Sequence, residues 1–170
     1  MEAGFDVRGS ETIGMAQRGG SVVSHVRIGS EIASPLIEAG GADIIIAFEP
    51  GEAARVASRL GPDGVLLVSD RAIMPAIAGE YNPAKTLVWL RNHIDALHIV
   101  SGQDVIQACG ARGLNVALLG AAAALGTLPF GMEELKGAIR KRLPEKFVAA
   151  NIAALAYGAG AIETGKRGCI

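Results

Sequence analysis

The clearest fold signal in the sequence is DIIIAFEPGEAARVASRLGPDGVLLV, residues 43–68. Its two apolar runs, at 43–48 and 65–68, are typical of parallel strands that are buried on both faces. Between them, Pro50 suits the first turn of a helix, and apolar residues then recur at helical spacing as far as Leu60. The Gly-Pro-Asp-Gly sequence that follows ends this helix. The stretch therefore predicts a β-α-β unit with a right-handed crossover.

Shorter elements are predicted on both sides of this unit. They are strands at residues 4–7, 21–28 and 96–100, a helical turn at Pro35–Ala39, and helices at 86–93 and from Ser101 to Cys109. In the strand at 21–28, alternation places Val23, His25 and Arg27 on one face. Ser101 and Asp104 resemble a capping pair.

The last third of the chain is predicted to be helical. Asn115–Leu125 is apolar on all sides, which indicates a buried helix, and Glu133–Arg142 is amphipathic with its acids first and its bases last. A final helix opens at Pro144 and ends near Gly158, and residues 159–170 are expected to form a flexible tail. The whole chain is predicted to be one α/β domain of three layers, a mainly parallel sheet with helices on both faces and a helical C-terminal region.

Composition excludes several classes of protein. The net charge of −1 argues against a nucleic-acid or membrane-surface partner, because both need a basic excess. Cys109 and Cys169 are fewer than the roughly four thiolates that an iron–sulfur cluster requires. No apolar run approaches the roughly 20 residues of a membrane span, and the first residues do not resemble a signal peptide. We therefore expect a cytoplasmic protein.

The sequence contains no P-loop, no nucleophile elbow and no H-E-x-x-H zinc motif. The three histidines lie too far apart along the chain to indicate a metal site. The position of His98 inside an apolar strand favours a hydrogen-bonded core histidine. His25 is better interpreted as a solvated or interface residue than as a general base. We expect no catalytic residue and no metal ligand in this chain alone.

A polar, glycine-rich loop precedes the strand at 21–28. Gly19 and Gly20 allow backbone N–H groups to approach an anion or the backbone of a partner. Arg18 beside them can offer a planar fork to a carboxylate or a phosphate.

Other residues of this loop suit the same role. Gln17 adds a neutral hydrogen bond, Met15 adds an adaptable apolar contact, and Ser21 closes the segment. The loop is therefore a candidate contact for a substrate, for coenzyme A or for a partner chain. The alternative is a tight loop whose arginine pairs with a local acid such as Glu11.

The sequence GMAQRGGSVVSHVRIGSEIASPLIEAGGADIIIAFEPGEAAR, residues 14–55, closely resembles the gamma-type domain of the 2-oxoacid:ferredoxin oxidoreductases. It looks most like the small (beta) subunits of the indolepyruvate branch, in which the loop reads Met-(Ser or Ala)-Gln-Arg-Gly-Gly-Ser-Val, as residues 15–22 do here. Further similarity at NVALLGAAAAL from Asn115, and at PEKFVAANIAALAYG from Pro144, extends the resemblance over nearly the whole chain.

The resemblance implies chemistry that the chain's own residues do not. Such enzymes convert a 2-oxoacid, coenzyme A and oxidised ferredoxin to an acyl-CoA, carbon dioxide and reduced ferredoxin. A large partner subunit holds the thiamine diphosphate and the iron–sulfur clusters. This chain is then expected to bind no cofactor itself, to be inactive alone, to contact coenzyme A as co-substrate, and to meet ferredoxin through the complex. Family members usually open with a strand and a GxGGQG turn, so the natural chain is expected to extend upstream of Met1.

Glu49 and Asn115 are candidate crevice residues. Glu49, between a buried strand and a helix, is either a ligand contact at the strand's carboxyl end or a favourable carboxylate at a helix N-terminus. Asn115 favours a helix cap over a ligand contact. The buried helix from Asn115 and the face of Val23, His25 and Arg27 are candidate interfaces with the partner or, in a homodimer, with a second copy. Two alternatives remain for the function: a stand-alone doubly wound domain that binds a small molecule or coenzyme A, and a non-catalytic docking subunit.

Overall fold

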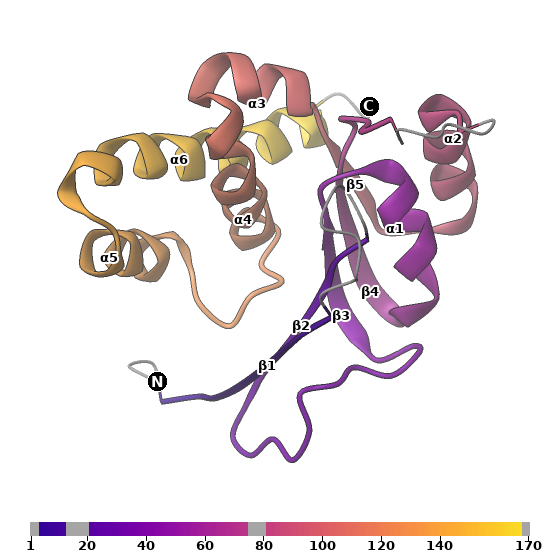
Figure 1. The fold of residues 1–170 in the computed structure, drawn as a ribbon, viewed down its shortest axis with the longest axis horizontal. Coiled ribbons are helices and arrows are strands. Elements are labelled where there is room, and N and C mark those ends of the chain that lie inside the picture. The colour runs from indigo at the N-terminus through magenta and orange to yellow at the C-terminus, as the bar shows by residue number, and fades with distance from the viewer. Residues whose placement is uncertain (1–3, 13–20, 75–80, 168–170) are drawn as a thin grey trace.

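The computed structural model describes residues 4–12, 21–74 and 81–167, with side chains as far as Ile162. The elements follow one another along the chain (Figure 1) in the order β1 Asp6–Thr12, β2 Val23–Gly29, β3 Ala42–Ala47, α1 Pro50–Val56, a 3₁₀ turn at Ala57–Arg59, β4 Leu60–Ser69, α2 Pro83–His93, β5 Leu97–Val100, α3 Gly102–Cys109, a 3₁₀ turn at Ala111–Gly113, α4 Leu114–Ala124, α5 Met132–Arg142 and α6 Glu145–Arg167.

A parallel sheet with β4 between β3 and β5 forms the centre of the molecule. The two apolar runs that predict it lie side by side, with Ile45 opposite Leu66 and Ala47 opposite Val68. Figure 1 shows α1 and α2 on one side of this sheet and α3, α4 and α6 on the other. The predicted three-layer α/β class is confirmed.

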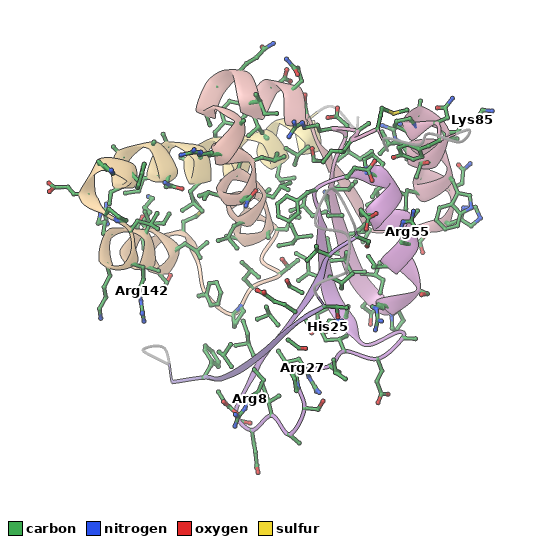
Figure 2. The ribbon with its side chains drawn as sticks, viewed as in Figure 1. Arg8, His25, Arg27, Arg55, Lys85 and Arg142 are labelled. Carbon is green, nitrogen blue, oxygen red and sulfur yellow. The ribbon has the colours of Figure 1, made fainter. Side chains whose placement is uncertain are left out.

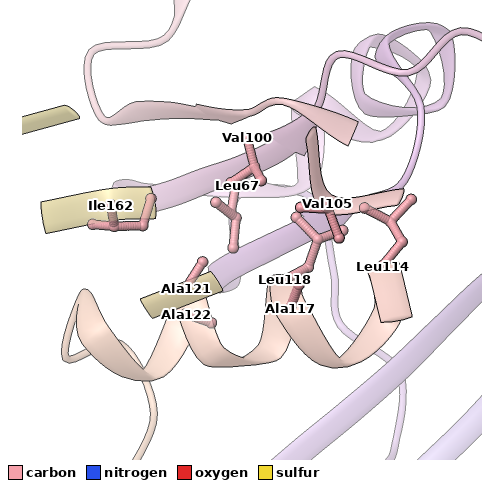
Figure 3. Close-up of a cluster of buried hydrophobic side chains, with 9 residues drawn as sticks. All are labelled: Leu67, Val100, Val105, Leu114, Ala117, Leu118, Ala121, Ala122 and Ile162. Carbon is pink, nitrogen blue, oxygen red and sulfur yellow. The ribbon is translucent and has the colours of Figure 1, made fainter. Parts of the chain in front are cut away.

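The side chains of β4 point alternately into two apolar clusters. Leu67 packs with Leu118 of α4 in the cluster drawn in Figure 3. Leu66 points to the other side, where it packs with Ala53 of α1 and Leu90 of α2. Because successive residues of a strand face opposite ways, burial on both faces requires the continuous apolar run seen in the sequence.

Helices α4 and α6 pack closely because each presents a glycine to the other. A Cβ atom at Gly158 would lie 1.8 Å from the carbonyl oxygen of Ala117, and one at Gly120 would lie 2.0 Å from that of Leu155. The predicted burial of α4 is confirmed. Its role as a partner interface stays a prediction, although α6 and the sheet of the same chain cover much of the helix.

Strands β1 and β2 form an antiparallel hairpin apart from the parallel sheet (Figure 1). The strand expected at residues 4–7 runs instead from Asp6 to Thr12, so part of the predicted loop is paired backbone. Among the described elements, none packs extensively along this hairpin.

Three other expectations about local structure are wrong. Pro35–Ala39 has no helical turn, because His25 and Arg59 bind the backbone N–H and carbonyl of Ile37. Residues 61–64 lie inside β4, where glycines let the strand approach the backbone of Ala42 and the register with β3 shifts. The last helix does not end near Gly158 with a tail from residue 159, but continues to Arg167, and its Ile162 is buried in the core.

The remaining helix predictions are confirmed by α1, α2, α3 and α5. Ser101 caps α3, since its Oγ accepts the N–H of Asp104 at 3.3 Å. Of the helices described, none is by itself long and apolar enough to cross a bilayer. Only the pair formed by residues 102–109 and 111–124, bent by 117°, reaches that length and composition.

Candidate functional site: a crevice at the edge of β3

A cavity of about 410 Å³ runs along the outer edge of β3, between this strand, β2 and α1. Ile44, Ile45 and Ile46 all line it, together with Ala47. Successive residues of a strand point to opposite faces, so consecutive residues can line one cavity only at the strand's edge. No described strand pairs with this edge of β3, since β4 occupies the other edge. The crevice is therefore bounded by backbone groups as well as by apolar side chains.

His25 of β2 contributes to the opposite wall of the crevice and is held in one orientation. The residue is only 6% exposed, and its Nδ1 accepts the backbone N–H of Ile37 at 2.9 Å. An imidazole that accepts at Nδ1 carries its proton on Nε2. The expectation of a solvated His25 is wrong, because the segment that follows β2 folds back over this face of the hairpin.

That segment is fastened to the hairpin by further side chains. The backbone N–H of Ile32 donates to the Asp6 carboxylate at 3.3 Å, and the Arg27 guanidinium donates to the carbonyl of Ser34 at 3.1 Å. Figure 2 shows Arg27 beside Arg8 of the neighbouring strand. The hairpin face predicted as an interface is thus occupied by the chain's own segment.

Glu49 lies where β3 ends and α1 begins. The residue is 7% exposed, and its Oε2 accepts the N–H of Glu52 at 2.9 Å, so it is the N-cap of α1. Its Oε1 accepts the hydroxyl of Tyr81. The helix-terminus interpretation of Glu49 is confirmed. Its interpretation as a crevice residue stays a prediction, for which the side chain is suitably placed because it also lines the cavity.

Tyr81 is a site residue that sequence reasoning missed. Its hydroxyl donates to Glu49 and accepts the N–H of Gly51 at 3.0 Å. Burial, with the hydrogen bond to Glu49 and the charge of that carboxylate, raises the pKa of Tyr81 to about 12, so the phenol remains a donor at neutral pH. A Cβ atom at Gly51 would lie 2.9 Å from the Glu49 carboxylate and 3.2 Å from the Tyr81 ring, so a larger residue there would displace these side chains.

The local signal for Tyr81 is weak. Tyr81 precedes Asn82, which caps α2, and Pro83, which opens that helix. The sequence therefore predicts that a helix starts after Tyr81, but not what the Tyr81 side chain contacts. Its contact with Glu49 spans 32 positions, and no spacing rule links the two.

Ser21 is the described member of the predicted loop. Its hydroxyl donates to the carboxylate of Glu52, in the first turn of α1. The other predicted loop residues lie outside the described part of the chain, and they are Met15, Gln17, Arg18, Gly19 and Gly20. Ser21, just before β2, and Tyr81, just before α2, therefore both bind the first turn of α1.

Large apolar side chains are exposed around this end of the crevice. Val22, Phe48 and Ile73 line the cavity and are nevertheless 60%, 43% and 59% exposed, and Met74 beside them is also exposed. Contiguous apolar surface of this kind marks contact sites on soluble proteins. We call Val22, Phe48, Ile73 and Met74 the apolar rim.

Asn115 does not belong to this constellation. It is exposed in the first turn of α4, and the N-cap of that helix is Gly113, with no side-chain hydrogen bond, so the capping prediction is wrong. The structure places Asn115 outside the lining of the crevice. Among the described side chains, no group of three or more His, Cys, Asp or Glu residues is placed to hold a metal ion.

Comparison with known proteins identifies the family. A family model described as "Pyruvate ferredoxin/flavodoxin oxidoreductase" matches residues 1–161. The chain belongs to this family. Among pyruvate ferredoxin/flavodoxin oxidoreductase relatives, "Indolepyruvate oxidoreductase subunit IorB" of Archaeoglobus fulgidus is 37% identical over 164 residues, which are 93% of this chain and 81% of that protein. The protein of the same name from Pyrococcus horikoshii is 32% identical over 165 residues, 93% of this chain and 82% of its own length.

A solved structure shows the same fold. The gamma subunit of a keto/oxoacid ferredoxin oxidoreductase from Geobacter sulfurreducens superposes with a TM-score of 0.65 over 96% of this chain and 83% of that one, at 23% identity. The family model and the IorB relatives confirm the resemblance inferred from the sequence. The chain is a small-subunit member of a family of oxidoreductases.

Proposed function

We propose that this chain is the small subunit of an indolepyruvate-type 2-oxoacid:ferredoxin oxidoreductase. In the complete enzyme a 2-oxoacid loses carbon dioxide, its acyl group passes to the thiol of coenzyme A, and two electrons leave for two oxidised ferredoxins. The similarity to subunits named IorB, over 93% of this chain, is the observation that carries this proposal.

Thiamine diphosphate and the iron–sulfur clusters are assigned to a large partner subunit. Thiamine diphosphate supplies carbanion stabilisation, and the clusters carry single electrons. This chain is proposed to complete the cytoplasmic enzyme by presenting its loop of residues 15–21 to the active site of the partner or to the phosphates of coenzyme A. Arg18 gives this loop a bidentate, permanently charged group for such anions.

The geometry around Ser21 supports this role for the loop. The hydrogen bond from Ser21 to Glu52 attaches the loop's last residue to the first turn of α1, at the end of the crevice. Val22 and Phe48 of the apolar rim line the same cavity as Glu52, so a partner that covers them would also lie close to Ser21.

Reconstitution tests the proposal. The purified chain alone should show no thiamine-dependent reduction of ferredoxin, and addition of the large subunit should restore it. Arg18→Ala should lower the activity of the assembled enzyme, whereas Arg91→Ala, an exposed change on α2, should not. Turnover by the isolated chain would refute the subunit assignment, and unchanged kinetics with coenzyme A would remove Arg18 from the site.

The two alternatives give different results in the same experiments. A stand-alone domain would bind coenzyme A without a partner, which calorimetry detects. A purely docking subunit would lose affinity for the large subunit on Arg18→Ala, while turnover per assembled complex stayed constant.

A further inference from the structure

The corner between α5 and α6 is a cationic surface far along the chain from the crevice. Every residue from Arg140 to Phe147 is exposed. This stretch holds Arg140, Lys141, Arg142 and Lys146 against one carboxylate, Glu145. Figure 2 shows Arg142 on the side of α5 that is turned away from α6. In a chain whose net charge is −1, this corner is a local excess of positive charge.

Large apolar groups are interleaved with these cations. Leu143 is 37% exposed and Phe147 is 41% exposed. The Lys146 ammonium lies 5.1 Å from the centre of the Phe147 ring, which places a charge and an aromatic face at one spot. Nucleic-acid backbones and loosely held counter-ions need no such apolar content, whereas protein interfaces combine aromatic groups with cations.

Helix α6 continues this surface with a face that carries no charge. No charged residue occurs between Phe147 and Ile162. Its inner face is buried against α4, as at Leu155. Its outer face is exposed and is composed of Ala149, Ala150, Ala153, Ala156, Tyr157 and Gly160.

A helix that is apolar on all sides is normally buried on all sides. Among the residues that the structure describes, Ala149, Ala150, Ala153, Ala156 and Tyr157 on the outer face of α6 are nevertheless exposed. The small side chains of this face allow another backbone to approach closely, and Tyr157 offers an amphipathic anchor of the kind enriched in interfaces.

We propose that the outer face of α6 and the cationic corner, residues 140–160, form a docking surface for the large partner subunit, whose matching surface is apolar at its centre and acidic at its border. This inference rests on the proposed function for the existence of that partner. The positive charge of the corner favours a partner surface that is acidic where it meets the corner, because bringing like charges together at an interface costs several kcal/mol. The uncharged face of α6 fits a permanent subunit, because obligate interfaces are more apolar than transient ones. The surface is separate from the apolar rim, so the partner would contact this chain at two places.

The test measures binding of the purified chain to the large subunit at low and high salt. Arg140→Glu with Arg142→Glu changes the formal charge of residues 140–147 from +3 to −1. Ala153→Asp places a charge in the middle of the outer face of α6. The matched control is Lys85→Glu with Arg91→Glu on α2, which changes the net charge equally at exposed positions (Lys85 is labelled in Figure 2). Circular dichroism of each isolated chain establishes that all variants are folded, as their exposure leads us to expect.

The corner variant should associate at least about tenfold more slowly at low salt and lose most of its salt dependence, because charge mainly steers encounter. Ala153→Asp should dissociate at least about tenfold faster, because most interface changes act on the dissociation rate. The control should behave as the wild type.

Other results overturn the inference in recognisable ways. Normal binding by both variants would remove this surface from the interface and leave the proposed function intact. Normal assembly with a raised KM for ferredoxin would show that the surface receives the electron carrier instead. A dimer of the isolated chain that Ala153→Asp abolishes, with the complex unaffected, would show that a second copy covers it. A wild-type chain that does not bind the large subunit would refute the proposed function itself.

Discussion

Gly158→Ala should destabilise the protein although it places a better helix former in a helix. The new methyl group would lie 1.8 Å from the carbonyl oxygen of Ala117, whereas real Cβ contacts are essentially never shorter than 3.0 Å. The facing helix must therefore retreat by about 1.2 Å, and it cannot do so by rotating a side chain, because the obstacle is backbone. Forced overpacking costs about 1 to 3 kcal/mol or more. The gain in helix propensity offsets about 1 kcal/mol of this cost.

We expect a net loss of about 2 kcal/mol in the free energy of unfolding, since a backbone obstacle belongs at the upper end of the overpacking range. For a domain of this length the corresponding fall in Tm is about 4–8 °C. Urea denaturation followed by circular dichroism measures the first quantity, and a thermal scan measures the second. Gly137→Ala in α5 is the matched control, because no atom lies within 4 Å of its added Cβ, and it should raise stability by up to about 1 kcal/mol. A Gly158→Ala chain as stable as the wild type would refute the close packing of α4 and α6.

Three further results follow from the site. Tyr81→Phe should lower the free energy of unfolding by about 1–3 kcal/mol, since it leaves the N–H of Gly51 and the neighbouring carboxylate short of a partner, whereas Tyr157→Phe at an exposed position should change it little. In a Tyr157→Phe background, absorbance titration should show Tyr81 ionising near pH 12. The pKa of Tyr81 in the folded protein lies above its ordinary value of 10.0. The contribution of Tyr81 to the free energy of unfolding is therefore complete below pH 10 and is lost between pH 10 and 12. His25→Phe should speed hydrogen exchange of the Ile37 amide at least about tenfold, as the acceptor of that N–H is removed, and an unchanged exchange rate would contradict the assigned hydrogen bond.

The parallel sheet is predictable from sequence because burial on both faces leaves a continuous signal. Residues 43–48 and 65–68 contain few polar side chains, and both appear as neighbouring strands. The start of α1 is also predictable, because Pro50 has the φ of a first helical turn and the Glu49 cap binds only the N–H groups of its own helix. The uncharged run 115–125 likewise has only one stable location, in the core.

Features that depend on distant contacts were not predictable. The hairpin extends to Thr12 because residues 10–12 pair with residues 23–25, a register that no local propensity encodes. Pro35–Ala39 departs from its helical tendency because His25 and Arg59 bind the N–H and the carbonyl of Ile37. The end of the last helix was misplaced at Gly158 because that glycine serves close packing, and helix propensity alone cannot distinguish this from a helix end. The expected extension upstream of Met1 stays a prediction.

The first turn of α1 explains why a nearly buried carboxylate is retained at the mouth of an apolar crevice. A serine or asparagine would cap α1 equally well, but neither has two acceptor oxygens that reach in different directions. Glu49 uses one oxygen for the helix and the other for Tyr81. Glu52, three residues later in the same turn, accepts a hydrogen bond from Ser21. The same turn thus fixes the end of the segment before α2 and the end of the segment that carries Arg18. A shift of α1 would consequently move Ser21 and Tyr81 together relative to the crevice, and this coupling supports the proposal that the loop ending at Ser21 serves the same site.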